Sequence, residues 1–357
     1  MTIYYVLYIL IFISTEICKR TNGILEQRQR RTAVVPALLL VLVLGLRHPS
    51  MGIDLKYGKV GGYLWSFEAI SNYSWHELLQ LGGWENYEWG YIFYNKLLGY
   101  ISTSDQLLLF VSASISLLPL AVLFAKKSRD LAFSYIIYMG LPCFLLPFSG
   151  LRQAIAIGIC VLATPSICDK NWKRFLVTIL IATLFHYSAV IYLLAYPLYH
   201  LRLPKSYRPL MVPLLLVIYM ARYPIFAVAS KLFKKNAVPD DNGAFVLFLV
   251  FIMIFIFYQV YCRSDDESSI GFMNIFYFAC ICQCFGGVFS TAMRVGFYFM
   301  PSLAVALPNI LTTISNQRDR RLLQYIIFAI FVIYGLYALA TSSWPMAYPY
   351  YFFWEEF

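Results

Sequence analysis

The chain has 357 residues, of which 61% are hydrophobic, 18% are aromatic and only 13% are charged. A soluble domain carries about 25% charged residues, so this composition excludes a soluble globular protein and indicates one embedded in a membrane. The net charge of +10 does not indicate nucleic-acid binding, because many of the basic residues are grouped in short clusters between apolar runs.

Long apolar runs predict an all-α, polytopic integral membrane protein. Only helices and closed barrels span a bilayer, and these runs are too long for barrel strands. At about 20 residues per span we expect about 10 or 11 transmembrane helices, in a single domain covering residues 1–357. The first 18 residues lack a basic start and a cleavage site and predict a retained first span. The runs lie at 1–18, 32–46, 106–125, 131–148, 150–168, 174–200, 209–222, 243–262, 270–292, 295–314 and 322–343.

Basic clusters between the runs predict the orientation. The positive-inside rule places such clusters in the cytoplasm. If 19–31 is cytoplasmic, the N-terminus and the loop 47–105 are external. Seventeen of the 28 basic residues form five clusters: Lys19 and Arg20 with Arg28, Arg30 and Arg31; Lys126, Lys127 and Arg129; Lys170, Lys173 and Arg174; Arg202, Lys205 and Arg208; and Arg318, Arg320 and Arg321.

The run 174–200 interrupts this alternation. A single crossing there would place the basic clusters at 202–208 and 318–321 outside. Both become cytoplasmic if the run enters from the cytoplasm, breaks near His186 and returns, as broken helices do where they line a cavity. The alternative is one long tilted helix followed by a basic external loop. The re-entrant topology predicts an external cavity on which polar groups from distant segments converge.

The external loop opens with GLRHPSMGIDLKYGKVGGY at 45–63. Arg47, Asp54 and Tyr57 are candidate ligand-binding residues, because the neighbouring glycines let backbone approach a ligand closely. An ordinary polar turn, with Arg47 reaching toward lipid headgroups, explains the same residues equally well.

The rest of the external loop is aromatic and acidic. Its tryptophans and tyrosines are typical of an interfacial belt or an amphipathic interfacial helix, and aromatic rings also stack on sugars. Glu85 and Glu88 are candidate general bases in this segment.

Two arginines lie just outside apolar stretches: Arg152 in FSGLRQAIAIGI and Arg294 in STAMRVGFYFM. A guanidinium at the centre of a spanning helix costs about 2.5–3.5 kcal/mol, so such a residue is kept where it faces a polar cavity and holds an anion. Arginine binds phosphate through a planar fork of donors, which indicates a phosphate-bearing substrate. A snorkelling anchor at the membrane surface is the alternative. The cysteines lie mostly in apolar runs and predict small buried residues rather than a metal site.

These pieces together resemble the EpsG family of exopolysaccharide and O-antigen polymerases, which are functionally Wzy-like. The most specific pieces are LRQAIAIGI at 151–159 and KRFLVTILIATLFHYSAVIY at 173–192. The others follow in matching order over nearly the whole chain: GLR at 45–47, G-x-D at 52–54 with Tyr57, EWGY at 88–91, Arg294 with Tyr298, and PYYFFW at 349–354.

The resemblance implies a glycosyltransferase that polymerises undecaprenyl-pyrophosphate-linked repeat units for O-antigen, capsule or exopolysaccharide. It would work at the outer face of the bacterial cytoplasmic (inner) membrane, without a cofactor. Its partners would be the lipid-linked glycans and membrane lipid, and a chain-length regulator is an open further partner.

The chemistry of this reaction suggests roles for the candidate residues. The sequence has no D-x-D and no cluster at metal-ligand spacing, so arginines would stabilise the departing pyrophosphate. The acceptor hydroxyl needs a general base, and Asp54, Glu88 and His186 are the candidates, with Asp54 slightly favoured. The residues expected to bind substrate are Arg47, Tyr57, Arg152, Gln153, Arg294 and Tyr298.

Two other functions are compatible with arginines in a membrane cavity. A lipid-linked oligosaccharide flippase or export component would need them as well, but would show internal repeats and a central cationic path. A membrane O-acyltransferase could use His186 as its base, but its acyl-CoA would arrive from the cytoplasm, whereas the polar groups point outward.

Overall fold

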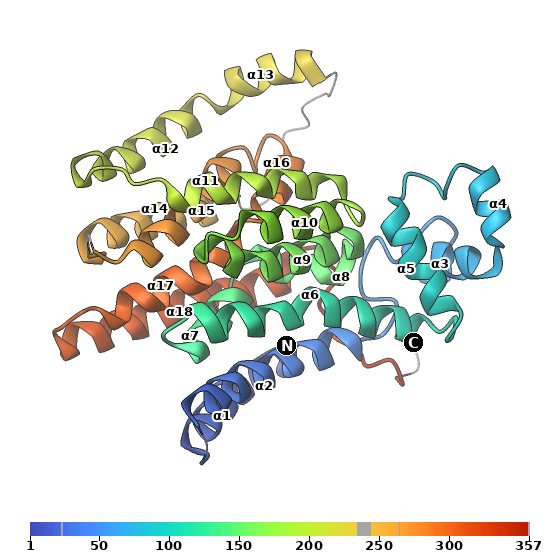
Figure 1. Ribbon diagram of the computed structural model, residues 1–357, viewed down its shortest axis with the longest axis horizontal. Helices are drawn as coiled ribbons and strands as arrows, with labels where there is room; N and C mark the ends of the chain where they lie inside the picture. Colours follow the sequence, from blue (N-terminus) through green and yellow to red (C-terminus); the bar gives the residue numbers. More distant parts are fainter. Residues whose placement is uncertain (23, 234–243, 264, 356–357) are drawn as a thin grey trace. The chain divides into compact units, whose positions relative to one another are not determined.

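The computed structural model describes residues 1–22, 24–233, 244–263 and 265–355 (Figure 1). It is 75% helical, and the described part of the chain contains no β-strand, which confirms the all-α class. The chain forms two compact units, described separately below; the single domain stays a prediction. The first unit comprises residues 1–190 and 327–357, and the second comprises 191–326.

The first unit is built from long apolar helices and from the short helices of the loop between α2 and α6. The 3₁₀ helix η2 (Tyr187–Leu194) and α18 (Gln317–Thr341) run across the boundary with the second unit. The other elements are α1 (Thr2–Arg20), α2 (Leu25–Gly45), α3 (Tyr63–Asn72), α4 (Trp75–Gln80), α5 (Trp89–Gly99), α6 (Asp105–Lys127), α7 (Leu131–Met139), η1 (Pro142–Phe144), α8 (Leu146–Ser149), α9 (Leu151–Cys168) and α10 (Trp172–Thr183).

Antiparallel packing gives the first unit two distinct ends. Helices α2 and α6 lie side by side, and Gln106 at the start of α6 donates a hydrogen bond to the carbonyl oxygen of Gly45 at the end of α2. Toward the other end, Lys127 Nζ at the end of α6 lies 2.9 Å from Oδ1 of Asp169, which follows α9. We call this second end the basic end. It carries three of the predicted basic clusters: 19–31, 126–129 and 170–174.

The segment 131–149 crosses the unit as a bent pair of helices. Its two halves meet at 79°. Tyr135 Oη in the first half donates to the carbonyl oxygen of Ala33 near the start of α2, whereas the carbonyl oxygen of Pro147 accepts from Arg47 just after the end of α2. Gly140 lies at the bend. A larger residue would not fit there, because its Cβ would come within 2.5 Å of a carbonyl oxygen of α18.

The predicted break near His186 is present. Helix α10 begins at the basic end and stops at Thr183, and η2 begins at Tyr187. At 1.5 Å per residue, the path from Trp172 to His186 covers about 20 Å, so His186 lies well away from the basic end. The return of this run to the cytoplasm stays a prediction, because η2 leads into the second unit.

The re-entrant topology predicts where Ser206 lies. Ser206 is exposed in η3, within the basic stretch 202–208. With Ser206→Cys in a background free of reactive cysteines, a membrane-impermeant maleimide should label the protein only after the membrane is opened. Thr103→Cys, exposed in the loop predicted to be external, is the matched control and should react in intact spheroplasts. Labelling of both from outside would contradict the re-entrant path.

The helices long and apolar enough to cross a membrane are fewer than expected. Among the described residues there are five, or up to eight if each bent pair is one span, instead of the 10 or 11 that the apolar runs predict at about 20 residues each. Part of the difference arises because three of the runs fold as bent pairs of short helices, and the runs 32–46 and 270–292 lie in single helices, α2 and α15, that are not among the candidate spans. Besides 131–149, the bent pairs are Lys205–Met220 with Arg222–Val228, at 63°, and Ser290–Gly296 with Met300–Thr312, at 41°.

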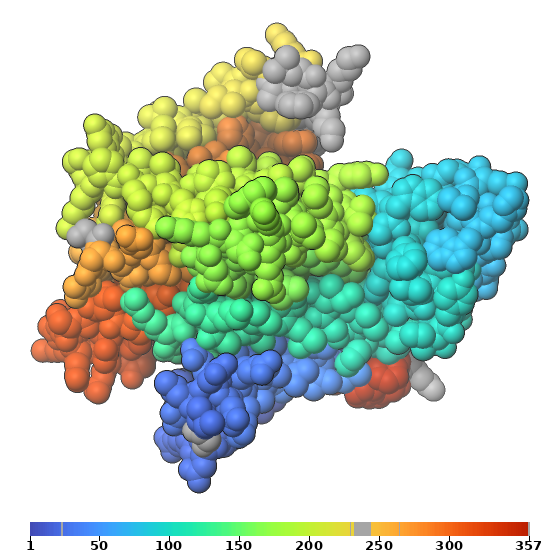
Figure 2. All heavy atoms as spheres, in the orientation of Figure 1, coloured from blue at the N-terminus to red at the C-terminus, as the bar shows by residue number. Residues whose placement is uncertain are grey.

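The loop between α2 and α6 is an ordered helical extension of the first unit. Figure 2 shows its residues as a cyan projection beyond the helices of that unit. Lys96, near the end of α5, fastens this helix to the end of α3 by donating hydrogen bonds to the carbonyl oxygens of Ser71 and Tyr73. The loop joins α6 and α9 through one apolar core, formed by Leu55, Tyr63, Leu64, Phe67, Tyr91, Tyr94, Leu98, Leu108, Leu109, Leu151 and Ile155.

Residues 347–353 pack against the start of this same loop. The Tyr350 hydroxyl donates to the carbonyl oxygen of Val43 at 2.8 Å. Backbone hydrogen bonds join His48 to Tyr351 and Phe353 to Leu46. The chain after α18 therefore holds the end of α2 and the turn that follows it.

The second unit is also entirely helical in its described part. Aromatic side chains form much of its core, as where Phe251 and Phe255 pack on Phe276. Its elements are α11 (Ala195–His200), η3 (Lys205–Leu210), α12 (Met211–Met220), α13 (Arg222–Phe233), α14 (Ala244–Tyr261), α15 (Glu267–Cys284), α16 (Ser290–Gly296), η4 (Met300–Ser302) and α17 (Leu303–Thr312).

Candidate functional site

Arg152 is the second residue of α9 and lies at the end of the first unit opposite the basic end. Its Nη1 donates to Glu88 Oε2 at 2.6 Å and to the carbonyl oxygen of Asn86 at 2.9 Å. Its Nε lies 3.4 Å from the Tyr63 hydroxyl, and its guanidinium stacks over the ring of Tyr87 at 4.4 Å. The loop between α2 and α6 therefore holds the arginine on three sides.

Glu88 binds Arg152 and His186 with its two different carboxylate oxygens. It precedes α5 as the N-terminal capping position and is only 2% exposed. While Oε2 binds Arg152, Oε1 lies 3.0 Å from His186 Nδ1 and accepts the backbone N–H of Tyr187 at 3.1 Å. Because the helix breaks after α10, the Tyr187 N–H and the His186 imidazole are available to bind this carboxylate.

The electrostatics keep Glu88 ionised. Burial by itself raises the pKa of this carboxyl, but the hydrogen bond from His186, the charge of Arg152 and backbone N–H groups outweigh burial and lower the pKa of Glu88 to about 2. A carboxylate with so low a pKa is a weak base at neutral pH, because a general base works best when its pKa is near the operating pH.

Two polar atoms remain open in this cluster. Within the described residues, Arg152 Nη2 and His186 Nε2 have no hydrogen-bond partner. A neutral His186 that donates from Nδ1 to Glu88 carries its lone pair on Nε2. The arrangement can therefore donate to an anion from Arg152 and accept a proton at His186.

Asp54 lies at the same end of the unit, tied to the segment that precedes α9. The Ser149 hydroxyl donates to its Oδ2 at 2.9 Å, and the Asp54 backbone N–H lies 3.2 Å from Ser149 Oγ. The carbonyl oxygen of Asp54 accepts the backbone N–H of Tyr63, whose hydroxyl contacts Arg152. Asp54 is exposed, so its carboxylate is accessible.

Arg47 is fully buried, which the sequence did not predict. Its guanidinium donates to four backbone carbonyl oxygens, those of Leu44, Met51, Pro147 and Phe148. These contacts fasten the start of the loop to the bent pair 131–149. A role for Arg47 in substrate binding stays a prediction.

The other predicted binding residues differ in exposure and place. Tyr57 is 49% exposed and packs edge-on against His48, whereas Gln153 is 3% exposed. Arg294, half-buried in the last turn of α16, and the fully buried Tyr298 belong to the second unit. Their convergence with Arg152 stays a prediction, as does the external cavity: the pockets between α2 and α6 and beside α12 contain none of the predicted site residues.

Tyr63, Tyr87 and Asn86 were not singled out by the sequence. Tyr63 and Tyr87 stack on one another with ring centres 5.8 Å apart and form the surface on which Arg152 lies. Asn86 contributes a backbone carbonyl oxygen, which leaves no sequence signal. Both tyrosines belong to the aromatic loop. The abundance of aromatic residues in the sequence around Glu88 is the feature from which they could have been predicted.

The sequence model of the EpsG family matches residues 30–352. The chain belongs to the EpsG family. This match includes every residue of the Arg152, Glu88 and His186 cluster, and it supports a Wzy-like polysaccharide polymerase at the level of the family. No curated protein and no solved structure matches the chain.

Proposed function

We propose that this EpsG-family protein polymerises undecaprenyl-pyrophosphate-linked repeat units, with Arg152, Glu88 and His186 at its catalytic centre. The observation that carries the proposal is the single buried carboxylate of Glu88, which binds an arginine through one oxygen and an imidazole through the other. An anion-binding donor and a proton acceptor are thereby fixed next to each other.

In the proposed reaction, the acceptor hydroxyl oxygen attacks the anomeric carbon of the donor glycan. The bond from that carbon to the pyrophosphate oxygen breaks, and the pyrophosphate leaves with the electron pair. The hydroxyl proton goes to His186 Nε2, and Arg152 Nη2 donates hydrogen bonds to the leaving group, where charge develops. Glu88 orients the imidazole through its contact with Nδ1.

The proposed setting is the outer face of the bacterial inner membrane. The basic end is expected in the cytoplasm by the positive-inside rule, which would put the opposite end, with Arg152 and Asp54, on the outside. Arg47, Tyr57 and Gln153 of the first unit, and Arg294 and Tyr298 of the second, are kept as proposed substrate-binding residues, each to be tested by its own substitution.

The function is tested by incubating the purified protein with one lipid-linked repeat unit. A ladder of longer lipid-linked glycans should form without nucleotide sugar, and the protein with His186→Ala should give none. Movement of the lipid-linked unit across vesicles without a ladder would indicate a flippase. Acylated sugar from an added acyl donor would indicate an acyltransferase, and either result would contradict the proposal.

A further inference from the structure

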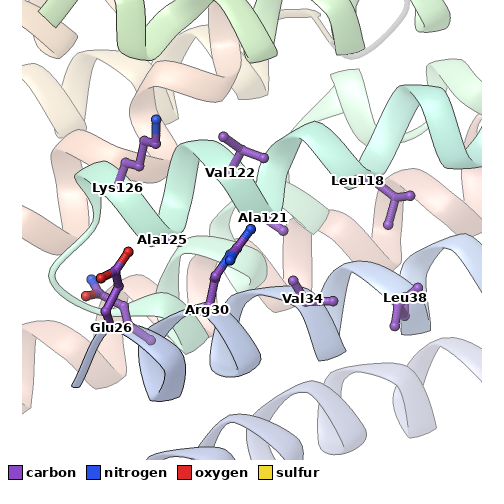
Figure 3. Close-up of a pocket in the computed structure, with 10 residues that line it drawn as sticks. Glu26, Arg30, Val34, Leu38, Leu118, Ala121, Val122, Ala125 and Lys126 are labelled. Atoms are coloured by element: carbon purple, nitrogen blue, oxygen red, sulfur yellow. The ribbon is translucent and has the colours of Figure 1, made fainter. Parts of the chain in front are cut away.

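An apolar groove lies between α2 and α6, in the half of these helices nearer the basic end (Figure 3). Its volume is about 600 Å³, within the range of about 300–1,000 Å³ typical of ligand sites. The small side chains of Ala121 and Ala125 leave room for the hollow. The apolar side chains that line it with them are Val34, Leu38, Leu118 and Val122, each between 36% and 44% exposed.

One end of the groove is charged. Figure 3 shows Glu26, Arg30 and Lys126 toward this end and Leu38 and Leu118 further along. Neither Arg30 nor Lys126 makes a side-chain hydrogen bond or ion pair with another described residue. By contrast, the neighbouring Lys127 is paired with Asp169. Arg30 and Lys126 are therefore available to bind an anion at the charged end of the apolar groove.

The apolar surface continues along both helices beyond the groove. Leu42 on α2 and Phe110 on α6 are also exposed, at 43% and 38%. The distance along α2 from Arg30 to Leu42 is about 18 Å at 1.5 Å per residue. One leaflet of the hydrocarbon core is about 15 Å thick, half of the bilayer value. The surface thus matches the depth of a single lipid chain below its headgroup.

We propose that this groove binds one anionic glycerophospholipid of the cytoplasmic leaflet. Arg30 and Lys126 bind its phosphate, and an acyl chain lies over Ala121 and Ala125. Two cations and the carboxylate of Glu26 give the groove a net charge of +1, which complements the single negative charge of a phosphodiester. Basic pockets between helices on the cytoplasmic side are known to bind such headgroups.

Native mass spectrometry of the full-length protein in detergent tests this site. The protein is titrated with phosphatidylglycerol, phosphatidylethanolamine and phosphatidylcholine of identical chains, and phosphatidylglycerol should bind most tightly. Arg30→Gln and Lys126→Gln should each weaken its binding roughly five-fold, and the double variant about 25-fold, by the usual contribution of a basic residue near an anionic headgroup. Arg31→Gln, exposed on the same helix but outside the groove, should leave binding unchanged.

Two further variants and one control test the site without changing either cation. Glu26→Gln should tighten phosphatidylglycerol binding because it removes a like charge, whereas weaker binding would indicate an amine-bearing lipid and overturn the proposal. Ala125→Phe fills the groove without changing any charge and should abolish the preference, while Ala340→Phe on an exposed face of α18 should not. Equal affinity of the wild-type protein for phosphatidylglycerol and phosphatidylcholine would also overturn it.

Discussion

Replacing Arg152 with lysine should reduce polymer formation by about 10²–10³-fold, the usual loss when one donor to a developing negative charge is removed. Arg152 contacts Glu88, Asn86 and Tyr63 with Nη1 and Nε, and in the proposed mechanism Nη2 binds the pyrophosphate. Lysine retains the charge but lacks the planar fork. It therefore cannot hold this loop and bind pyrophosphate in the same geometry.

The measurement is the initial rate of ladder formation by purified protein at saturating lipid-linked substrate. Arg31→Lys, an exposed arginine at the basic end, is the matched control and should leave the rate unchanged. Arg294→Lys tests the second unit in the same way and should also lose activity. Wild-type rates for both Arg152→Lys and Arg294→Lys would remove arginine binding of pyrophosphate from the mechanism.

His186→Asn should lower the rate by about 10²–10⁴-fold, the typical contribution of a general base. Glu88→Gln should lower it as well, because a neutral amide no longer holds Arg152 and His186 through two charged oxygens. The initial rate of ladder formation by the wild-type and variant proteins at saturating substrate measures both effects.

Asp54→Asn is the discriminating comparison, since Asp54 is the rival base and makes its polar side-chain contact with Ser149 rather than with His186. If His186 is the base, Asp54→Asn keeps more of the rate than His186→Asn does. A rate lost with Asp54→Asn but kept with His186→Asn would instead assign the base to Asp54.

Glu88 also links the site to acid stability. Its pKa of about 2 in the folded protein lies below the ordinary value of about 4.3 for glutamate. Because this pKa is lower than in the unfolded chain, ionised Glu88 stabilises the folded state at pH values above about 4.3. This stabilisation is lost as the pH falls through about 2. Glu88 therefore stays ionised at neutral pH.

Much of the site could be anticipated from residue types, but not its connections. Arg152 was a candidate because a guanidinium is costly near apolar helices, and Glu88 and His186 were candidates because the acceptor hydroxyl needs a general base. Glu88 and His186 were expected to be rival bases, whereas the structure joins them across 98 positions. That contact depends on how the loop folds over α9 and on the break after α10, and no local periodicity encodes either.

The positions of helix breaks and of Arg47 were less predictable for similar reasons. The run 131–148 reads as one apolar span, yet close packing of Gly140 on α18 permits a 79° bend. Arg47 is held by backbone carbonyl oxygens, which every residue type supplies. Hydropathy therefore predicts the class of the protein well, but it does not reveal contacts made by main-chain atoms.

The packing of residues 347–353 against the end of α2 has a consequence for biosynthesis. Tyr350 follows its partner Val43 by 307 positions, which a ribosome working at about 5–20 residues per second takes roughly 15–60 s to translate. Until then the turn at Arg47 lacks one of its two supports, although Arg152 and His186 are synthesised well before the segment after α18. The contacts of this segment with the end of α2 can therefore form only after nearly the whole chain has been made.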